Sequence, residues 1–263
     1  MSSHASFSGS VPANYDRYLG PVLFEPYALD LAGRIPAADG IRVLELACGT
    51  GRVTRRLRQA LPDTATLQAT DLNEPMVDYA RAAVPEPGIA WQAADAQALP
   101  FPDGSFDVIV CQFGLMFLPD KVQGLREARR VLAPGGLLIA SVWEPVDAHA
   151  HMRAIAVALD DLFAESPPRF LDVPHGYNDR DRIRADFAAA GWSDVEIELV
   201  RLVGESPSSR ELALGFTVGS PLAHELAERN ADPEAVADRL TEELGDRVPH
   251  EVELAALLLT ASR

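Results

Sequence analysis

Residues 43–51 carry the side chains and spacing in this chain that are most suited to ligand chemistry. An apolar run, VLELA (43–47), leads into a glycine turn, CGTG (48–51), and the next residues predict a helix. Glycines at a strand-to-helix turn let backbone N–H groups approach a ligand closely, because no Cβ stands in the way. Twenty residues after Gly51, Asp71 ends a second apolar run, where a carboxylate can accept hydrogen bonds from ribose hydroxyls. The spacing therefore predicts a site for an adenosine-containing ligand.

Glu45 distinguishes this turn from the common dinucleotide-binding fingerprint. That fingerprint needs a third glycine three positions after the second, and Thr54 stands there instead. A carboxylate at the end of the first strand would repel a pyrophosphate and attract a cation. The turn therefore favours a positively charged cofactor, although a NAD(P)-dependent oxidoreductase stays open as an alternative.

The elements that must position these residues follow an alternating pattern. Short apolar runs alternate with helical patterns, which predicts parallel strands joined by right-handed crossovers. We predict one domain over 1–263, with a cofactor-binding core at about 34–145 and helical lid inserts at about 146–177 and 205–247. Residues 1–20 are predicted to be loop-like, and a helix is predicted from Pro21. The predicted strands cover 41–47, 65–71, 89–94, 106–112, 137–143, 195–202 and 252–262.

Four ordered blocks between residues 41 and 145 resemble class I S-adenosylmethionine-dependent methyltransferases. The blocks are VLELACGTG (43–51), ATDLNEPMVDYAR (69–81), AADAQALPFPDGSFDVIVCQFGLMFLPD (93–120) and EARRVLAPGGLLIASVW (127–143). The third is most similar to the small-molecule group that includes the ubiquinone/menaquinone biosynthesis methyltransferases. The resemblance implies S-adenosylmethionine as the cofactor and in-line methyl transfer to a small acceptor. It also implies a doubly wound, Rossmann-like α/β fold, in which a seven-stranded sheet is mostly parallel and its last strand is antiparallel.

The resemblance assigns cofactor-binding roles by position in this sequence. Glu45 would lie near the amino group of the cofactor, Asp71 would bind the ribose and Gln112 would face the methionine end. Asp95 would meet the adenine edge, although it could instead cap its own loop, and Met76 could equally be a core residue. Replacing Asp71 by alanine is expected to weaken cofactor binding by about 1.5–3 kcal/mol with little change in ligand-free stability. The complete predicted set is Glu45, Ala47, Gly49, Gly51, Asp71, Leu72, Met76, Asp95, Ala96 and Gln112.

Aromatic side chains predict where the acceptor binds. Tyr15, Tyr18 and Phe24 precede the first predicted strand, and Phe113 and Phe117 follow the fourth. Aromatic faces there can stabilise a sulfonium and pack against a flat acceptor, which is therefore expected to be apolar or aromatic. Tyr18 is preferred over its neighbours, because it lies in a polar, glycine-flanked segment. The predicted acceptor-binding residues are Tyr18, Phe24, Phe113 and Phe117, and core packing is the alternative for Phe24 and Phe117.

The sequence does not identify a catalytic residue. Of the histidines that follow the predicted core, His149, His151, His175, His224 and His250, the better candidates for a general base are His151 and His175. No cluster of histidine, cysteine or acidic residues has metal-ligand spacing, so no metal site is predicted. Oxygen, nitrogen and carbon nucleophiles all stay open.

The net charge and the composition limit the classes of partner that we expect for this chain. The net charge of −16 argues against a nucleic-acid substrate, and the residues after the fourth strand read QFGL (112–115) rather than a nucleic-acid methyltransferase motif. The two cysteines give no disulfide framework, and the amino-terminal residues resemble no signal peptide. We therefore expect a cytoplasmic protein with a small-molecule acceptor and no membrane insertion. The sequence leaves open a dimer, and also a non-catalytic module that keeps the cofactor fold.

Overall fold

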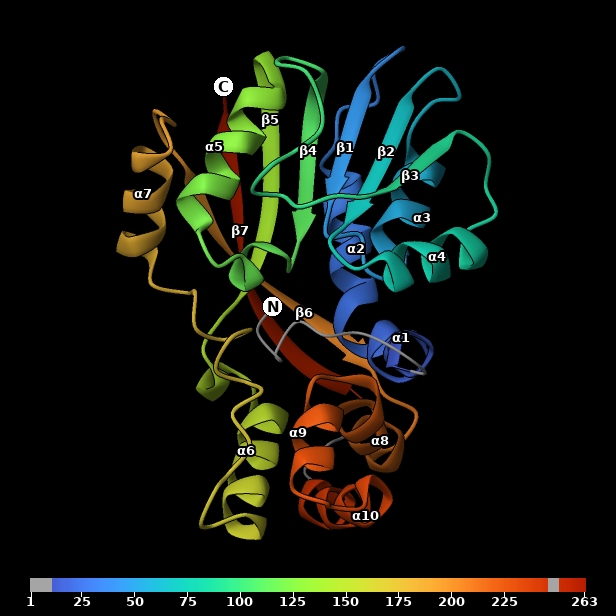
Figure 1. Cartoon of the computed structure of the whole chain (residues 1–263), viewed down its shortest axis with the longest axis vertical. Helices are drawn as coiled ribbons and strands as arrows, with labels where there is room; N and C mark the ends of the chain where they lie inside the picture. Colours follow the sequence, from blue (N-terminus) through green and yellow to red (C-terminus); the bar gives the residue numbers. More distant parts are fainter. Residues whose placement is uncertain (1–10, 246–250) are drawn as a thin grey trace.

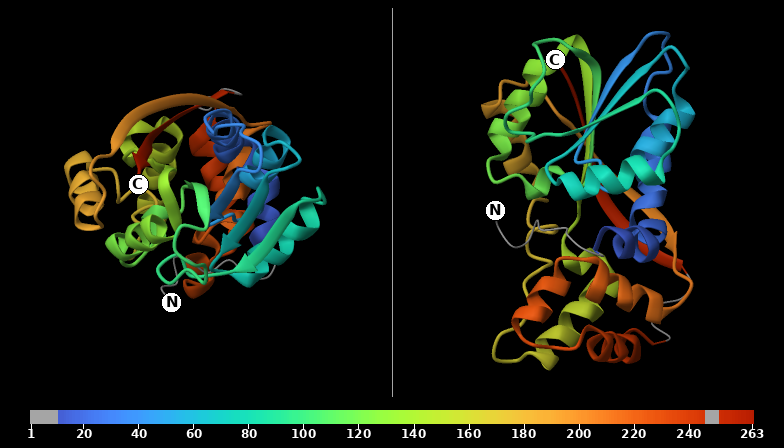
Figure 2. Two further views of the ribbon diagram at one scale, coloured as in Figure 1. Left: turned by 90° about the horizontal axis from the view of Figure 1, so that it is seen from above. Right: turned by 45° about the vertical axis from the view of Figure 1, so that its right-hand side comes forward.

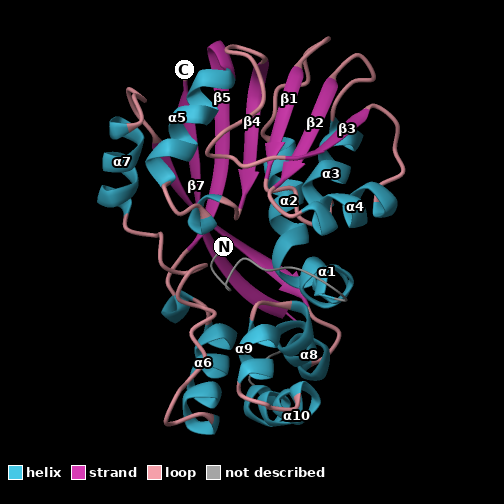
Figure 3. Cartoon of the chain, in the orientation of Figure 1, coloured by secondary structure: helices cyan, strands magenta, loops and turns pink. Residues whose placement is uncertain are grey.

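The computed structural model describes residues 11–245 and 251–263, in which a seven-stranded sheet carries helices on both faces (Figure 1, Figure 3). The strand order is β3-β2-β1-β4-β5-β7-β6. Strands β1 to β5 are parallel to one another, and β7 is antiparallel to both β5 and β6. The predicted fold class, with its antiparallel last strand, is confirmed. The strands are β1 (Arg42–Leu46), β2 (Thr66–Asp71), β3 (Ile89–Ala93), β4 (Phe106–Gln112), β5 (Leu132–Trp143), β6 (Glu196–Glu205) and β7 (Glu251–Ser262).

Helices α2 and α3 cover one face of the sheet, and α5 and α7 cover the other (Figure 2). The apolar stripes of these helices and the central strands form the core, in which β1 and β4 are almost wholly buried. No described helix is long and apolar enough to cross a membrane. The helices are α1 (Val11–Asn14), α2 (Glu25–Gly33), α3 (Arg52–Ala60), α4 (Glu74–Ala83), α5 (Lys121–Val131), α6 (Ala150–Leu162), α7 (Arg180–Ala189), α8 (Ser209–Gly219), α9 (Leu222–Glu228) and α10 (Pro233–Leu244).

A second group of helices lies beyond the carboxyl ends of the parallel strands. Figure 1 shows α6, α8, α9 and α10 gathered there, next to the long ends of β6 and β7. Helix α10 packs against both α6 and α8. These helices occupy the two predicted inserts, although residues 246–247 of the second insert and His250 lie outside the described residues. The carboxyl ends of the parallel strands thus face a helical cover.

The amino-terminal segment differs from its prediction as a loop. Residues 11–24 are helical, with α1 followed by a π-helical segment, Tyr15–Phe24, that contains Pro21. Sequence rules treat Gly20-Pro21 as a break, but Gly20 is buried, and a Cβ on it would overlap the guanidinium of Arg52. Tertiary packing therefore determines the helical conformation of this segment. π-Helical turns are rare and often occur at functional sites.

Strand β5 also begins earlier than the predicted start at Leu137. Leu132 already pairs with Phe106 of β4, and a register shift before Val108 takes up the Pro-Gly-Gly residues 134–136. The strand continues to Trp143, which lines a cavity at the carboxyl ends of the strands.

Candidate functional site

The glycine turn after β1 is held in a conformation that glycine adopts readily and residues with a Cβ rarely adopt. Ala47 (φ 54°), Gly49 (φ 54°) and Gly51 (φ 84°) all lie in the left-handed region. A Cβ on Gly51 would lie 2.9 Å from a methyl group of Val84, whereas a Cβ on Gly49 would meet nothing within 4 Å. Gly51 is therefore needed for packing against the end of α4, and Gly49 leaves open space beside the turn.

Asp71 joins this turn to the end of β2. One of its carboxylate oxygens accepts the backbone N–H of Gly49 at 2.9 Å, and the other accepts the backbone N–H of Asn73 at 2.9 Å. Burial raises the pKa of Asp71, and these hydrogen bonds partly offset that effect. Asn73 occupies the N-cap position of α4, but its side-chain amide donates to Asp71 rather than capping the helix. Asp71 therefore fixes the turn and also faces the space beside it.

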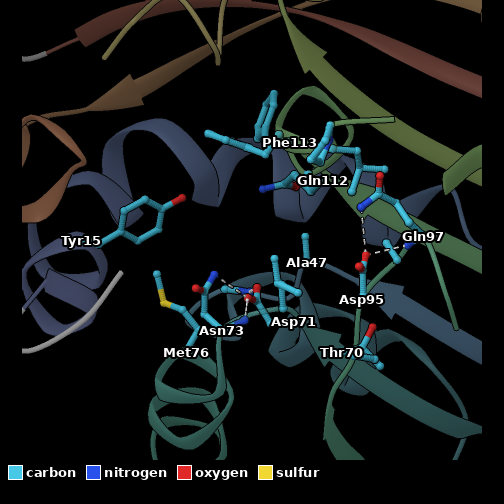
Figure 4. A pocket seen from close by; sticks show the side chains of 18 residues that line it. Tyr15, Ala47, Thr70, Asp71, Asn73, Met76, Asp95, Gln97, Gln112 and Phe113 are labelled. Atoms are coloured by element: carbon cyan, nitrogen blue, oxygen red, sulfur yellow. Dashed lines mark hydrogen bonds between the residues drawn. The ribbon is translucent and has the colours of Figure 1, made fainter. Parts of the chain in front are cut away.

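A first cavity opens where the strand order reverses between β1 and β4, which is where doubly wound sheets bind ligands. Its empty volume is about 900 Å³, open mouth included. Figure 4 shows Tyr15 facing Gln112 and Phe113 across this space, with Asp71 and Asn73 on another side. The lining residues are Tyr15, Ala47, Gly49, Thr70, Asp71, Leu72, Asn73, Met76, Ala94, Asp95, Ala96, Gln97, Gln112, Phe113, Gly114, Phe117, Leu118 and Pro119.

The structure brings eight of the ten predicted cofactor-binding residues to this cavity and leaves two outside its lining. One of the two is Gly51, which faces α4. The other, Glu45, is 2% exposed on β1, and burial, with the charge of Asp71, raises its pKa to about 8. The expectation of an ionised Glu45 at the mouth of the turn is therefore corrected: in the ligand-free protein the side chain is largely protonated at neutral pH. Its Oε2 atom is buried without a hydrogen-bond partner.

Two further predicted residues show how the cavity suits a ligand with hydrogen-bond donors. Gln112 donates its side-chain N–H to the carbonyl of Phe24 at 3.1 Å, and its Oε1 atom is buried without a partner. Asp95 accepts the backbone N–H of Gln97 at 2.8 Å through one oxygen, so the loop-capping alternative also holds. Buried polar atoms without partners are costly, and a bound donor would satisfy the oxygen of Gln112.

A second cavity, with an empty volume of about 600 Å³, adjoins the first. It shares Tyr15, Phe113 and Phe117 with the first cavity. Phe113 has a φ of 55°, which is unusual for an aromatic residue, and its ring stacks on Trp143 with centroids 3.7 Å apart. The two cavities therefore meet at an aromatic junction. The second is lined by Tyr15, Leu19, Leu23, Phe24, Phe113, Met116, Phe117, Trp143, Met152, Phe170, Leu171, Pro174, His175, Phe216, Ser220 and Pro221.

The predicted acceptor-binding residues divide between this cavity and its surroundings. Phe24, Phe113 and Phe117 line it, but Tyr18 lines neither cavity. The ring of Tyr18 lies beside the guanidinium of Arg17 instead, 4.9 Å from ring centroid to Cζ. The preference for Tyr18 is therefore corrected in favour of Tyr15. Recognising the amino-terminal helix would have placed Tyr15 on the face that also buries Leu19.

Ion pairs fix the segment that carries Tyr15 to the glycine turn. The Asp16 carboxylate pairs with Arg52 of α3 at 2.9 Å and accepts the hydroxyls of Thr50 and Tyr79 at 3.2 and 3.1 Å. Arg52 also pairs with Glu25 at 2.9 Å. Since these side chains are four-fifths buried or more, the pairs are less screened by water than surface pairs. The π-helical segment is thus held against the first cavity.

Three histidines of the first insert gather behind the second cavity. The ring centroid of His149 lies 5.9 Å from that of His151 and 5.3 Å from that of His175. Burial lowers the pKa of His149 to about 4 and of His151 to about 3, and it also lowers the pKa of His175. His175 lines the cavity, whereas His151, the other sequence candidate for a base, does not. Among the described residues, no group of potential ligands is placed to hold a metal ion.

Sequence comparisons with known proteins find methyltransferases. A methyltransferase domain model matches residues 44–140. The ubiquinone/menaquinone biosynthesis C-methyltransferase UbiE of Shewanella baltica is 36% identical over 140 residues, which cover 49% of this chain and 55% of that protein. The UbiE protein of Burkholderia vietnamiensis is 32% identical over 168 residues, which cover 60% of this chain and 69% of that protein. The chain therefore spans about half the length of the Shewanella relative.

Solved structures share the fold at low sequence identity. The YcgJ protein of Bacillus subtilis has a TM-score of 0.59 and 20% identity, over 90% of this chain and 98% of that chain. A phosphoethanolamine N-methyltransferase of Haemonchus contortus, in complex with S-adenosylhomocysteine, has a TM-score of 0.62 and 15% identity, over 96% of this chain and 57% of that chain. The [4+2]-cyclase SpnF has a TM-score of 0.58 and 19% identity, over 96% of this chain and 93% of that chain. These likenesses concern the fold alone.

Proposed function

Starting from the family to which this chain belongs, the class I S-adenosylmethionine-dependent methyltransferases, we propose that it transfers a methyl group to a small, apolar or aromatic acceptor. The observation that carries this proposal is the pair of cavities that meet at Phe113 and Phe117. The first is polar at the strand ends, and the second is almost wholly apolar.

The first cavity fits the cofactor of this family. We propose that Asp71 binds the ribose hydroxyls, that Leu72 and Met76 pack against the adenine, and that Asp95 accepts from the adenine amino group. The unpartnered oxygen of Gln112 suits the charged amino group of the methionine end. We further propose that Glu45, buried on β1 outside the cavity lining, offsets that positive charge through water once it releases its proton. Ala96 lies beside Asp95 on the adenine side, and Ala47 and Gly49 present backbone.

We propose that the second cavity binds the acceptor. When bound, S-adenosylmethionine supplies an electrophilic methyl group on a sulfonium. The residues of this chain would then hold the acceptor in line with that methyl group, and such positioning is worth about 7–11 kcal/mol in well-oriented reactions. The aromatic rings of Phe113 and Trp143 exclude water and can stabilise the sulfonium charge. No lysine or arginine of the described chain lines this cavity, which disfavours a phosphate- or carboxylate-bearing acceptor. Helices α6, α8, α9 and α10 would serve as the lid.

The test is methyl transfer from labelled S-adenosylmethionine into fractionated cell extract. We expect label in organic-soluble small molecules and not in nucleic acid or protein. Leu171→Trp, which fills part of the second cavity, should lower this transfer while leaving S-adenosylhomocysteine affinity unchanged. Label in nucleic acid, or transfer that Leu171→Trp does not affect, would contradict the proposed acceptor site. A protein that binds S-adenosylhomocysteine yet labels no fraction would favour a non-catalytic module.

A further inference from the structure

His175 places an imidazole ring in the wall of a largely apolar cavity. The residue is 8% exposed and lies in the loop that follows α6, with Trp143 and Pro174 beside it in the cavity wall. Sequence alone offers no reason to prefer it over His151. The fold separates the two, because His151 packs on the far side of His149.

The backbone of Glu144 fixes which nitrogen of His175 carries the proton. Nδ1 of His175 lies 2.7 Å from the carbonyl oxygen of Glu144. A carbonyl oxygen can only accept, so Nδ1 must be the donor and therefore carries the hydrogen. In the neutral ring, Nε2 then has a free lone pair and acts as a hydrogen-bond acceptor.

The surroundings of His175 favour the neutral ring. Burial lowers its pKa, so the ring stays uncharged at neutral pH. The titratable rings next to it, His149 and His151, are also buried with lowered pKa values. Of the other charged groups nearby, Glu144 pairs with Arg180 at 2.6 Å, and Arg201 disfavours added positive charge on His149.

The other small polar group in the cavity wall already has partners. The hydroxyl of Ser220 donates to the carbonyl of Phe216 at 2.6 Å and accepts the backbone N–H of Leu222 at 3.2 Å. Apart from the Tyr15 hydroxyl at the junction with the first cavity, the side-chain acceptor that this wall offers to a polar group on a ligand is Nε2 of His175. An acceptor nitrogen recognises a donor. A hydroxyl and an amine N–H are both donors that can attack a methyl group, and the hydroxyl, the weaker nucleophile of the two, gains more from a base that takes its proton.

We propose that Nε2 of His175 binds a hydroxyl group of the acceptor and takes its proton during methyl transfer. This inference rests on the proposed function and adds the attacking atom and the base. The acceptor oxygen forms the new C–O bond with a lone pair, the C–S bond breaks with its electrons going to sulfur, and the O–H proton passes to Nε2. The products are a methyl ether, S-adenosylhomocysteine and an imidazolium, which returns its proton to water. The O–H group becomes strongly acidic as its oxygen bonds to the methyl group, so a neutral imidazole with a lowered pKa is basic enough to take the proton.

The test compares 2-naphthol with naphthalene as probes of the complex with S-adenosylhomocysteine. The wild-type complex should bind 2-naphthol about 3–10-fold more tightly than naphthalene, the scale of one neutral hydrogen bond. His175→Asn keeps a donor for the Glu144 carbonyl but has no acceptor at the Nε2 position, and it should bind both probes equally. His175→Gln should recover part of the preference. His224→Asn, on a half-exposed histidine of α9, is the matched control and should keep the wild-type ratio.

Methyl transfer to 2-naphthol then separates binding from proton removal. Wild type and His224→Asn should form 2-methoxynaphthalene, whereas His175→Asn and His175→Gln should be at least about 100-fold slower, because neither side chain is basic. Equal probe affinities in the wild type, or unchanged rates in both His175 variants, would overturn the inference. Binding of 2-naphthol without methylation, or methylation on carbon, would overturn the base and oxygen assignments. If the wild-type protein did not bind S-adenosylhomocysteine, that result would instead overturn the proposed function.

Discussion

Gly49 and Gly51 lie two residues apart in one turn, but replacing each by alanine should affect different properties, ligand affinity for Gly49 and stability for Gly51. Both have positive φ, so each substitution places an L-residue in the left-handed region. Only Gly51 is crowded, by Val84 and Ala80, at 2.9 and 3.1 Å from the position of an added Cβ. Gly49 has open space around it and lines the first cavity.

The expected magnitudes follow from these contacts. The left-handed conformation costs an L-residue about 1–2 kcal/mol, and overpacking a core costs about 1–3 kcal/mol. Gly51→Ala should therefore lower the free energy of unfolding by about 2–5 kcal/mol. Gly49→Ala should lower it by only about 1–2 kcal/mol, since Ala47 already adopts the same φ in this turn. The methyl group of Gly49→Ala would stand where the backbone approaches the ligand, so the Kd for S-adenosylhomocysteine should rise at least about tenfold, or 1.4 kcal/mol.

Urea unfolding of the ligand-free proteins and calorimetric titration with S-adenosylhomocysteine measure the two effects separately. Gly51→Ala should lose mainly stability, and Gly49→Ala should lose mainly affinity. If Gly49→Ala bound S-adenosylhomocysteine as tightly as the wild type, the cofactor would not approach this turn. If Gly51→Ala were as stable as the wild type, the contact with α4 would not constrain it.

Three further predictions concern the buried acidic groups. Asp71→Asn should raise the Kd for S-adenosylhomocysteine about 10–150-fold, equivalent to about 1.5–3 kcal/mol. It should also destabilise the ligand-free protein by about 1–3 kcal/mol, because an amide cannot accept from both backbone N–H groups. Unchanged affinity would refute the ribose assignment, and unchanged ligand-free stability would support the expectation from sequence that replacing Asp71 affects binding alone. Glu45 holds its proton up to a pKa of about 8 in the folded state and loses it near 4.5 in the unfolded state, so it makes stability fall as pH rises from 4.5 to 8. Urea unfolding across that range should show a smaller fall for Glu45→Gln, and identical pH slopes would contradict the raised pKa. Asp16→Asn should weaken S-adenosylhomocysteine binding several-fold and speed amide hydrogen exchange in residues 15–24, because Arg52 and Tyr79 lose their carboxylate partner. Unaltered exchange would show that these contacts do not hold the segment in place.

The sheet, and most of the residues that line the first cavity, could be predicted from the sequence because their signals are local. Apolar runs that end in glycines or acids give strands and turns, and strand order then brings Asp71, Asp95 and Gln112 to one edge. Glu45 shows the limit of this reasoning, because burial changes its protonation state, and burial depends on the whole fold.

The lining of the second cavity could be predicted only in part because its walls come from distant segments. The sequence favours Tyr18 over Tyr15 because Gly20-Pro21 hides a helix that tertiary packing stabilises. The polar atom of His175 is not separable from that of His151 in the sequence, since only the folded insert shows which ring reaches the cavity.

A crystal structure with S-adenosylhomocysteine bound would test the central claim most directly. We expect the ligand in the first cavity, with its ribose hydroxyls on Asp71 and its sulfur directed past Phe113 toward the second cavity. A ligand bound elsewhere, or one whose sulfur faces away from Phe113 and His175, would contradict the arrangement of cofactor and acceptor proposed for this chain.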